Sequence, residues 1–249
     1  MRHGQRTAYA QDLAYVHDES FGAPARGAGP VVLGGLRRAG FRKGLIVDLG
    51  CGSGILARTL TQSGYDVLGV DLSPEMLRLA ARNAPLATFK RASLLDVELP
   101  APCVAVTAIG ECFNYVFDPR NTLVALSRVF RRVYSALEPG GLLLCDVAGP
   151  GRLGQGQVRQ SLYDTADWTM YVRAEENRTG TRLTRDILLF RRSGTRYRRS
   201  DEHHALRLYP PEAIASRLEG AGFRVRRLRG YVPTHLRAMW PVFLAQKPR

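Results

Sequence analysis

The chain has 249 residues, of which 45% are hydrophobic, and this is enough to bury the core of one domain with an elaboration. No apolar run approaches the roughly 18 residues of a transmembrane helix, and residues 1–6 do not lead into the apolar stretch of a secretory signal. The four cysteines (Cys51, Cys103, Cys112 and Cys145) lack the spacing of metal ligands. We therefore expect a cytoplasmic protein without a membrane anchor, whose cysteines act as small buried hydrophobic residues.

Positive charge is concentrated in the second part of the chain. Residues 1–150 contain 16 Lys and Arg against 13 Asp and Glu, whereas residues 151–249 contain 20 against 9. Such a surface can attract nucleic acid or a phosphorylated small molecule. Arginine supplies 33 of the 36 basic residues, so a compositional bias is the other explanation. Few aromatic residues are interleaved with the arginines, and this disfavours binding of single-stranded nucleic acid.

Two helices are predicted before the first strand. Tyr9, Leu13 and Val16 have helical spacing, and residues 21–24 end that helix with a glycine and a proline. A second helix is predicted over residues 31–39, where Gly40 stops it.

The most informative stretch is LIVDLGCGSG, residues 45–54. Its apolar start predicts a buried strand that ends at Asp48, and residues 55–63 after it predict a helix. Three alternating glycines (Gly50, Gly52 and Gly54) form the turn between them. Glycines let the backbone approach a ligand closely, and the start of the helix offers free N–H groups. The pattern predicts a nucleotide-type ligand.

Two ligand classes compete for this loop. Gly52, Gly54 and Ala57 fit the dinucleotide fingerprint G-x-G-x-x-A, which favours a nicotinamide or flavin enzyme. Asp48 would repel a pyrophosphate but suits the ammonium group of an amino acid. Residues 48–54 resemble, at every position, motif I of the class I S-adenosylmethionine (SAM) dependent methyltransferases, which is acid-x-Gly-x-Gly-x-Gly.

The resemblance implies SAM as cofactor and assigns its contacts. Asp71 ends the strand predicted over residues 66–70, where an acid can accept both ribose hydroxyls, and Leu72 can lie on adenine. Many relatives carry an Asp after the third strand (residues 87–91), but Ser93 holds that position here. The predicted cofactor-binding residues are Asp48, Gly50, Cys51, Gly52, Gly54, Asp71, Leu72, Ser93, Leu94, Ile109 and Tyr9.

The loop after the fourth strand (residues 104–107) carries Glu111, Asn114 and Tyr115. Ligands of open α/β sheets bind beyond the carboxyl ends of the strands, so these side chains are predicted to orient the methyl acceptor. Core packing by Tyr115 and a local cap by Glu111 remain the alternative. The loop lacks an Asn/Asp-Pro-Pro-Tyr/Phe sequence, which counts against methylation of bases or amide nitrogens.

The rest of the chain completes the predicted fold. A helix (residues 121–137) precedes the string LEPGGLLL, which resembles the turn before the fifth strand in the same family. Residues 151–160 read as a loop. Strand-like runs at residues 168–176, 181–191 and 195–208 predict an antiparallel meander, because hairpin signals separate them. A helix (residues 213–219) and two strands (residues 224–231 and 240–245) follow.

We therefore predict an α/β fold: a Rossmann-like, seven-stranded, mostly parallel sheet with helices on both faces, plus an antiparallel β insertion after the fifth strand. Residues 1–40 would form a helical cap, 41–150 the SAM-binding core, 151–208 a substrate lid and 209–249 the end of the core. In the resembled family the N-terminal helices form one wall of the substrate pocket. This makes pocket candidates of Tyr9, Tyr15, His17, Asp18 and Phe21, although packing and a solvated helix end explain them as well.

The cap and the insertion favour a pocket for a small molecule. The predicted function is methyl transfer from SAM to a nitrogen, oxygen or carbon atom of a small molecule by in-line displacement, without a metal. The candidate catalytic residues are Glu111, His204, His203, Tyr115 and His17. Side chains alternate along a strand, so only one of the paired histidines can face inward, and the neighbouring Leu206 favours His204. A nucleic-acid (RNA) methyltransferase and a non-catalytic SAM-binding module remain alternatives.

Overall fold

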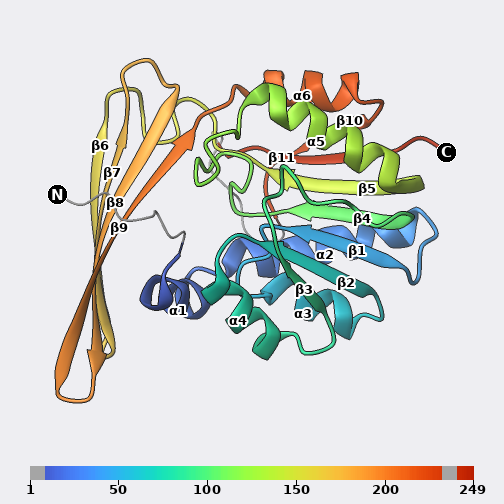
Figure 1. The fold of residues 1–249 in the computed structure, drawn as a ribbon. Helices are drawn as coiled ribbons and strands as arrows, with labels where there is room; N and C mark the ends of the chain where they lie inside the picture. The colour runs from blue at the N-terminus through green and yellow to red at the C-terminus, as the bar shows by residue number, and fades with distance from the viewer. Residues whose placement is uncertain (1–8, 232–239) are drawn as a thin grey trace.

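A seven-stranded sheet forms the centre of the computed structural model (Figure 1), which describes residues 9–231 and 240–249. The segment of residues 1–6, tested above for a secretory signal, lies outside the described residues. The strand order is β10-β11-β5-β4-β1-β2-β3, and β11 runs antiparallel to both of its neighbours. The strands are β1 (Leu45–Leu49), β2 (Asp66–Asp71), β3 (Thr88–Arg91), β4 (Cys103–Ala108), β5 (Leu137–Asp146), β10 (Arg224–Leu228) and β11 (Val242–Gln246). This arrangement confirms the predicted fold class.

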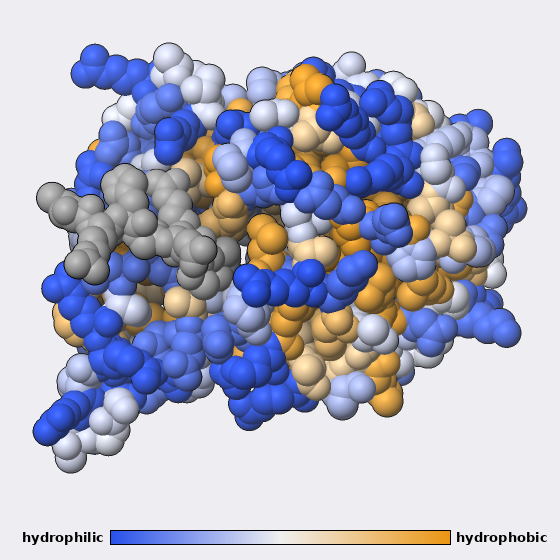
Figure 2. Space-filling view, viewed as in Figure 1, coloured by the Kyte–Doolittle hydropathy of each residue, from blue (hydrophilic) through white to orange (hydrophobic). Residues whose placement is uncertain are grey.

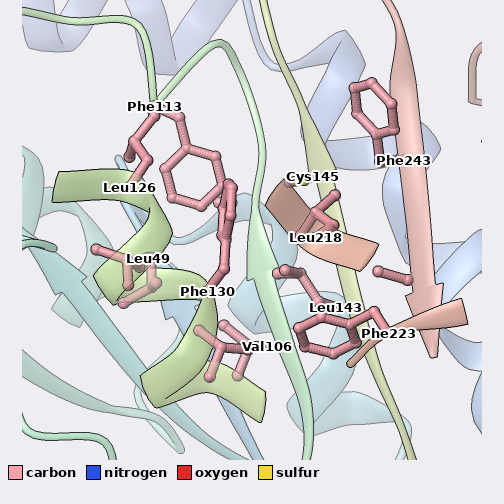
Figure 3. Close-up of a cluster of buried hydrophobic side chains, with 14 of the residues drawn as sticks. Leu49, Val106, Phe113, Leu126, Phe130, Leu143, Cys145, Leu218, Phe223 and Phe243 are labelled. Atoms are coloured by element: carbon pink, nitrogen blue, oxygen red, sulfur yellow. The ribbon is translucent and has the colours of Figure 1, made fainter. Parts of the chain in front are cut away.

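Helices cover both faces of this sheet. They are α2 (Ala23–Arg38), α3 (Ile55–Gln62), α4 (Pro74–Asn83), α5 (Leu123–Ala136) and α6 (Pro211–Gly220), and a further helix, α1 (Gln11–Ser20), precedes them. Apolar side chains of α5 and α6 pack on one face, where Phe130 and Leu218 lie near Phe113 and Leu143 (Figure 3). Side chains of α2 and α3 pack on the other face around Ile46. The strands are therefore buried on both sides, as their continuous apolar sequences predict.

The start of the second helix differs from the prediction. α2 begins at Ala23, eight residues before the predicted start. Pro24 lies in its first turn, where a missing N–H group costs no hydrogen bond. The prediction that residues 21–24 end the first helix is confirmed, because α1 ends at Ser20, but the same segment also begins α2. The expected cap of α4 is present, because the Ser73 hydroxyl accepts from the Met76 N–H at 3.1 Å.

The insertion is a separate four-stranded antiparallel sheet beside α1, drawn in yellow to orange in Figure 1. Its strands are β6 (Val158–Asp164), β7 (Trp168–Glu176), β8 (Arg182–Ser193) and β9 (Arg196–Arg207), in that spatial order. The prediction of a loop over residues 151–160 missed β6. This strand lies at an edge, and six of its seven residues are exposed, so its sequence lacks the alternation of a half-buried strand.

The helix α1 lies between the insertion and the core. Leu13 and Val16 pack against Trp168 and Met170 of the insertion, whereas Ala14 packs against Met76 of α4. Polar contacts reinforce this position, because Asp12 accepts from Arg198 Nε at 2.6 Å. No helix of the described residues is long and apolar enough to span a membrane. Hydrophilic side chains gather around the insertion at the left of Figure 2, while more apolar side chains appear on the core.

Candidate active site

The turn between β1 and α3 needs its glycines. Gly50, Gly52 and Gly54 all have positive φ, at 69°, 53° and 77°. A Cβ atom on Gly50 would lie 2.4 Å from the sulfur of Cys112, and one on Gly54 would lie 3.0 Å from Ala80. A Cβ atom on Gly52 would meet nothing within 4 Å. The loop is thus packed from below at two glycines and bare at the third, which is the shape that a close backbone approach to a ligand requires.

Asp48 lies beneath this loop. Its side chain is buried and accepts a hydrogen bond from the Thr107 hydroxyl of the neighbouring β4 at 2.6 Å. Burial raises the pKa of Asp48 to about 7. Asp48 and Gly54 are the two predicted cofactor-binding residues that do not line the cavity described next.

A cavity of about 640 Å³ runs from the glycine loop to the inner face of the insertion. At the loop end it is lined by the other predicted cofactor-binding residues: Gly50, Cys51, Gly52, Asp71, Leu72, Ser93, Leu94, Ile109 and Tyr9. These groups fit SAM, because they combine a bare glycine backbone, a carboxylate at a strand end and apolar side chains for a base.

Asp71 is the carboxylate at the end of β2. Its two oxygens accept from the N–H groups of Gly52 at 2.9 Å and Ser73 at 2.8 Å. Burial raises the pKa of Asp71, while these backbone donors oppose the rise. Each oxygen keeps a further lone pair for a hydroxyl donor. Ser93, at the expected adenine position, donates a hydrogen bond to Asp118 at 2.7 Å. Asp118 also lines the cavity there, and the sequence analysis did not identify it.

Glu111 lies at the other end of the cavity, in a strained turn with φ of 62°. The buried Asp146 carboxylate fixes this turn by accepting from the N–H groups of Gly110 and Glu111. The Glu111 carboxylate accepts from Arg185 at 2.7 Å and from Arg152 at 2.8 Å. Burial would raise the pKa of Glu111, but the two guanidinium groups outweigh it and hold the pKa below its usual range. Glu111 is therefore an ion-paired carboxylate and a weak proton acceptor.

Tyr115 connects Arg185 with the N-terminal segment. Its hydroxyl accepts from Arg185 at 3.0 Å and lies 3.0 Å from the hydroxyl of Tyr9. Burial raises the pKa of Tyr115, and the positive charge of Arg185 only partly offsets this effect. Tyr115 is thus a neutral phenol at neutral pH.

His204 is the inward-facing histidine of the pair. It is 2% exposed, lines the cavity and lies directly across from Arg185 in the pairing of β9 with β8. Its Nε2 atom lies 2.8 Å from the Glu202 carboxylate. That carboxylate also accepts from the N–H groups of Tyr9 and Ala10, at 3.1 and 2.8 Å.

Two other predicted residues do not reach the cavity. His203 points to the opposite face of the sheet, where its Nδ1 atom lies 2.6 Å from Asp186. The Asn114 side chain is buried in hydrogen bonds to the backbones of Ala148 and Arg207, so it fastens the loop to the insertion. Glu111, Tyr115 and His204 therefore line one cavity, whereas Asn114 does not. His203 faces outward, as strand alternation requires of one histidine of the pair.

The N-terminal helix contributes part of its predicted wall. Tyr9, His17 and Phe21 line the cavity, whereas Tyr15 lies under the guanidinium group of Arg191 and Asp18 accepts from Asn83. Burial lowers the pKa of His17 to about 4. Its Nδ1 atom has no hydrogen-bond partner in the described part of the chain.

Sequence reasoning missed several side chains of the acceptor end. These are Arg152, Arg185, Glu202, Phe117 and Trp240. The arginines are two of 33, and no local pattern separates them from the others. The alternation of β8 was the one available signal, because it places Arg185 on the same face as Leu183 and Ile187.

Residues 46–141 match the family model described as a methyltransferase domain. The protein YqeM of Bacillus subtilis is 27% identical over 195 residues, which cover 75% of this chain and 76% of YqeM. A SAM-dependent methyltransferase from Clostridium acetobutylicum is similar in structure, with a TM-score of 0.80 and 20% identity over 96% of this chain and 98% of that one.

A third similar protein is CalS10 from Micromonospora echinaspora, described as an amino pentose methyltransferase and solved with SAM bound. It has a TM-score of 0.73 and 20% identity, and covers 98% of this chain and 100% of its own. The two solved structures and the sheet order show the class I methyltransferase fold. The match of residues 46–141, the relative YqeM and the motif at residues 48–54 assign a SAM-dependent methyltransferase.

Proposed function

We propose that this enzyme transfers the methyl group of SAM to a small molecule bound between the core and the insertion. The observation that carries this proposal is the continuity of the cavity from the glycine loop to the inner face of the antiparallel sheet. Its volume of about 640 Å³ lies within the range of small-molecule sites, about 300–1,000 Å³. CalS10, whose description names an amino pentose, has the same fold over nearly the whole chain.

Each end of the cavity has a role in this proposal. Asp71 accepts the ribose hydroxyls, and Leu72, Ser93 and Leu94 hold adenine. Bound SAM supplies an electrophilic methyl group on its sulfonium. The chain itself orients the acceptor in line with that methyl group and excludes water, and these are the main tasks in such a displacement.

The insertion (residues 151–208) and the N-terminal helices α1 and α2 act as lid and cap over the acceptor. Apolar side chains of both parts line the cavity, among them Phe21 beside α1, Met170 of β7 and Ile187 of β8. The four cysteines are free thiols, which fits the reducing cytoplasm that composition predicts.

The test is an incubation of the full chain with deuteromethyl-labelled SAM and a metabolite extract, followed by mass spectrometry. We expect a small molecule that gains one deuterated methyl group, in lower yield at limiting SAM when an Asp71→Asn variant replaces the enzyme and not at all without enzyme. A parallel incubation contains total RNA. Label that enters RNA and no small molecule would contradict the proposal and favour an RNA methyltransferase.

A further inference from the structure

We infer that the acceptor reacts through a hydroxyl group, which His204 deprotonates while Glu202 orients the imidazole ring and Arg185 faces the oxygen that becomes charged. This inference rests on the proposed small-molecule function and specifies the acceptor atom. It comes from the contacts of three residues on the inner face of β8 and β9.

The hydrogen bonds of Glu202 determine which nitrogen of His204 carries the proton. The Glu202 carboxylate receives backbone N–H groups of Tyr9 and Ala10 and lies 2.8 Å from His204 Nε2. A carboxylate surrounded by donors acts as an acceptor, so Nε2 of the neutral ring bears the hydrogen and Nδ1 keeps a lone pair. Within residues 9–231 and 240–249, the hydrogen bond of the His204 ring is the one made by Nε2 with Glu202. Carboxylates orient histidine bases in the same way in other enzymes.

Aromatic rings hold the imidazole of His204 in place. The centroids of Tyr9 and Phe117 each lie 4.9 Å from the centroid of His204, and that of Tyr115 lies at 5.8 Å. Turning the ring would break the hydrogen bond to Glu202 and disturb this packing. Nδ1 therefore has a fixed direction, as a proton acceptor in catalysis requires.

The charges around His204 distinguish a hydroxyl from an amine. Two carboxylates face this region, and both have partners. Glu111 is shared by the guanidinium groups of Arg185 and Arg152, and Glu202 accepts from two backbone N–H groups and contacts His204. Tyr9, Tyr115 and His17 are neutral, because burial raises the pKa of the phenols and lowers that of His17. A protonated amine would find no carboxylate without a partner here. A developing oxyanion would find Arg185 across the strand pair from the base.

The hydroxyl proton of the acceptor passes to Nδ1 of His204, and the oxygen forms a bond with the methyl carbon. The carbon–sulfur bond breaks and leaves its electron pair on sulfur, which gives S-adenosylhomocysteine and a methyl ether.

Two probes of similar shape test the choice between oxygen and nitrogen. The full chain, saturated with S-adenosylhomocysteine, is titrated with 4-nitrophenol, whose absorbance reports ionisation, and with 4-nitrobenzylamine, which carries a positive charge. We expect the phenol to bind at least about tenfold more tightly and to ionise at a lower pH in the complex than in water. Equal or tighter binding of the amine, or an unchanged ionisation of the phenol, overturns the inference.

Variants of the strand pair supply matched controls. In the His204→Gln and Arg185→Gln variants, bound 4-nitrophenol should no longer ionise at a lower pH than in water. The first change removes the proton acceptor, and the second removes the positive charge. The control changes are His203→Gln and Asp186→Asn, which alter a histidine–carboxylate pair on the outer face of the same sheet. They should leave the probe unaffected, and melting curves check that all variants fold.

Glu202 acts through His204 and is a positioning residue, so its test needs a different readout. Glu202→Gln should raise the pH at which the bound phenol ionises by about one unit, because the amide no longer holds the Nε2–H of His204 and so no longer keeps Nδ1 directed at the phenol. An unchanged midpoint would show that Glu202 only anchors the N-terminal segment.

The labelled product of the metabolite screen decides the matter if neither probe binds. A deuteromethyl group on oxygen supports the inference. A deuteromethyl group on nitrogen or carbon overturns it while leaving the small-molecule function intact. Label that enters RNA alone contradicts the proposed function itself.

Discussion

The two ends of the cavity are built in different ways. At the cofactor end, Asp71 binds the backbone N–H groups of Gly52 and Ser73, which belong to the adjoining loops. At the acceptor end, charged side chains from distant segments pair with one another, as Glu111 does with Arg152 and Arg185. The cofactor end thus follows from the conformation of short local segments. The acceptor end exists only after the insertion and the core have come together.

Substitutions at the two ends should therefore affect different properties of the protein, ligand affinity at one end and stability at the other. Backbone donors at the cofactor end leave spare lone pairs for a ligand, so a change there should affect ligand affinity. Paired charges at the acceptor end satisfy one another in a buried place, and loss of one member leaves the others without compensation. A change there should affect the fold as well as turnover.

The largest expected effect is that of Glu111→Gln. It leaves the guanidinium groups of Arg152 and Arg185 without a counter-charge, and breaking a buried ion pair costs about 3 kcal/mol or more. Urea denaturation should show a loss of this size in the free energy of unfolding. The control is Glu219→Gln, an exposed residue at the end of α6, which should change little. Equal stability of both variants would remove the distinction between the two ends.

Asp71→Asn should act mainly on the cofactor. Two charge-assisted hydrogen bonds to ribose are worth about 1.5–3 kcal/mol each, so the affinity for SAM should fall at least about tenfold. Calorimetry with SAM measures this, and Asp66→Asn is the control because Asp66 is exposed at the other end of β2. An unchanged dissociation constant would show that the β2 carboxylate does not hold the ribose.

The contact of α1 with the insertion should weaken in acid. Burial would raise the pKa of Asp12, but its bonds to Arg198 and Arg191 outweigh that effect and lower it. A depressed folded-state pKa contributes stability that is present above the usual aspartate pKa of about 3.9 and is lost as the pH falls through the lower folded value. The melting temperature of the wild type should exceed that of Asp12→Asn at pH 7, and the gap should close toward pH 3. A constant gap would contradict the ion pair.

The smallest expected effect concerns nucleic acid. Fluorescence anisotropy with RNA and duplex DNA at physiological salt should show at most weak, sequence-independent binding despite the net charge of +14. Several arginines are already paired within the protein, Arg185 and Arg198 among them. Submicromolar binding of one structured RNA, with a steep salt dependence, would reverse the assignment of the acceptor end to a small molecule.

The sequence predicted more of the cofactor end than of the acceptor end, because the cofactor end depends more on local patterns. The β1 loop and Asp71 were predictable because the glycines and the strand-end acid lie within 24 residues of one another, in a pattern that backbone geometry imposes. The inward orientation of His204 followed from strand alternation and is confirmed by its burial. Arg185 and Glu202 were missed because their partners lie 74 and about 190 residues away. Asn114 was misplaced because a buried amide that binds backbone groups looks the same in sequence as one that binds a ligand.

The Asp146 carboxylate has a consequence for the order of folding during synthesis. It accepts hydrogen bonds from the turn at Gly110 and Glu111 and also from Tyr231 and Trp240. The strand β11 lies between β5 and β10, so the sheet closes only when the last part of the chain has left the ribosome. The acceptor turn therefore gains its complete set of hydrogen bonds around Asp146 only when Tyr231 and Trp240 are in place.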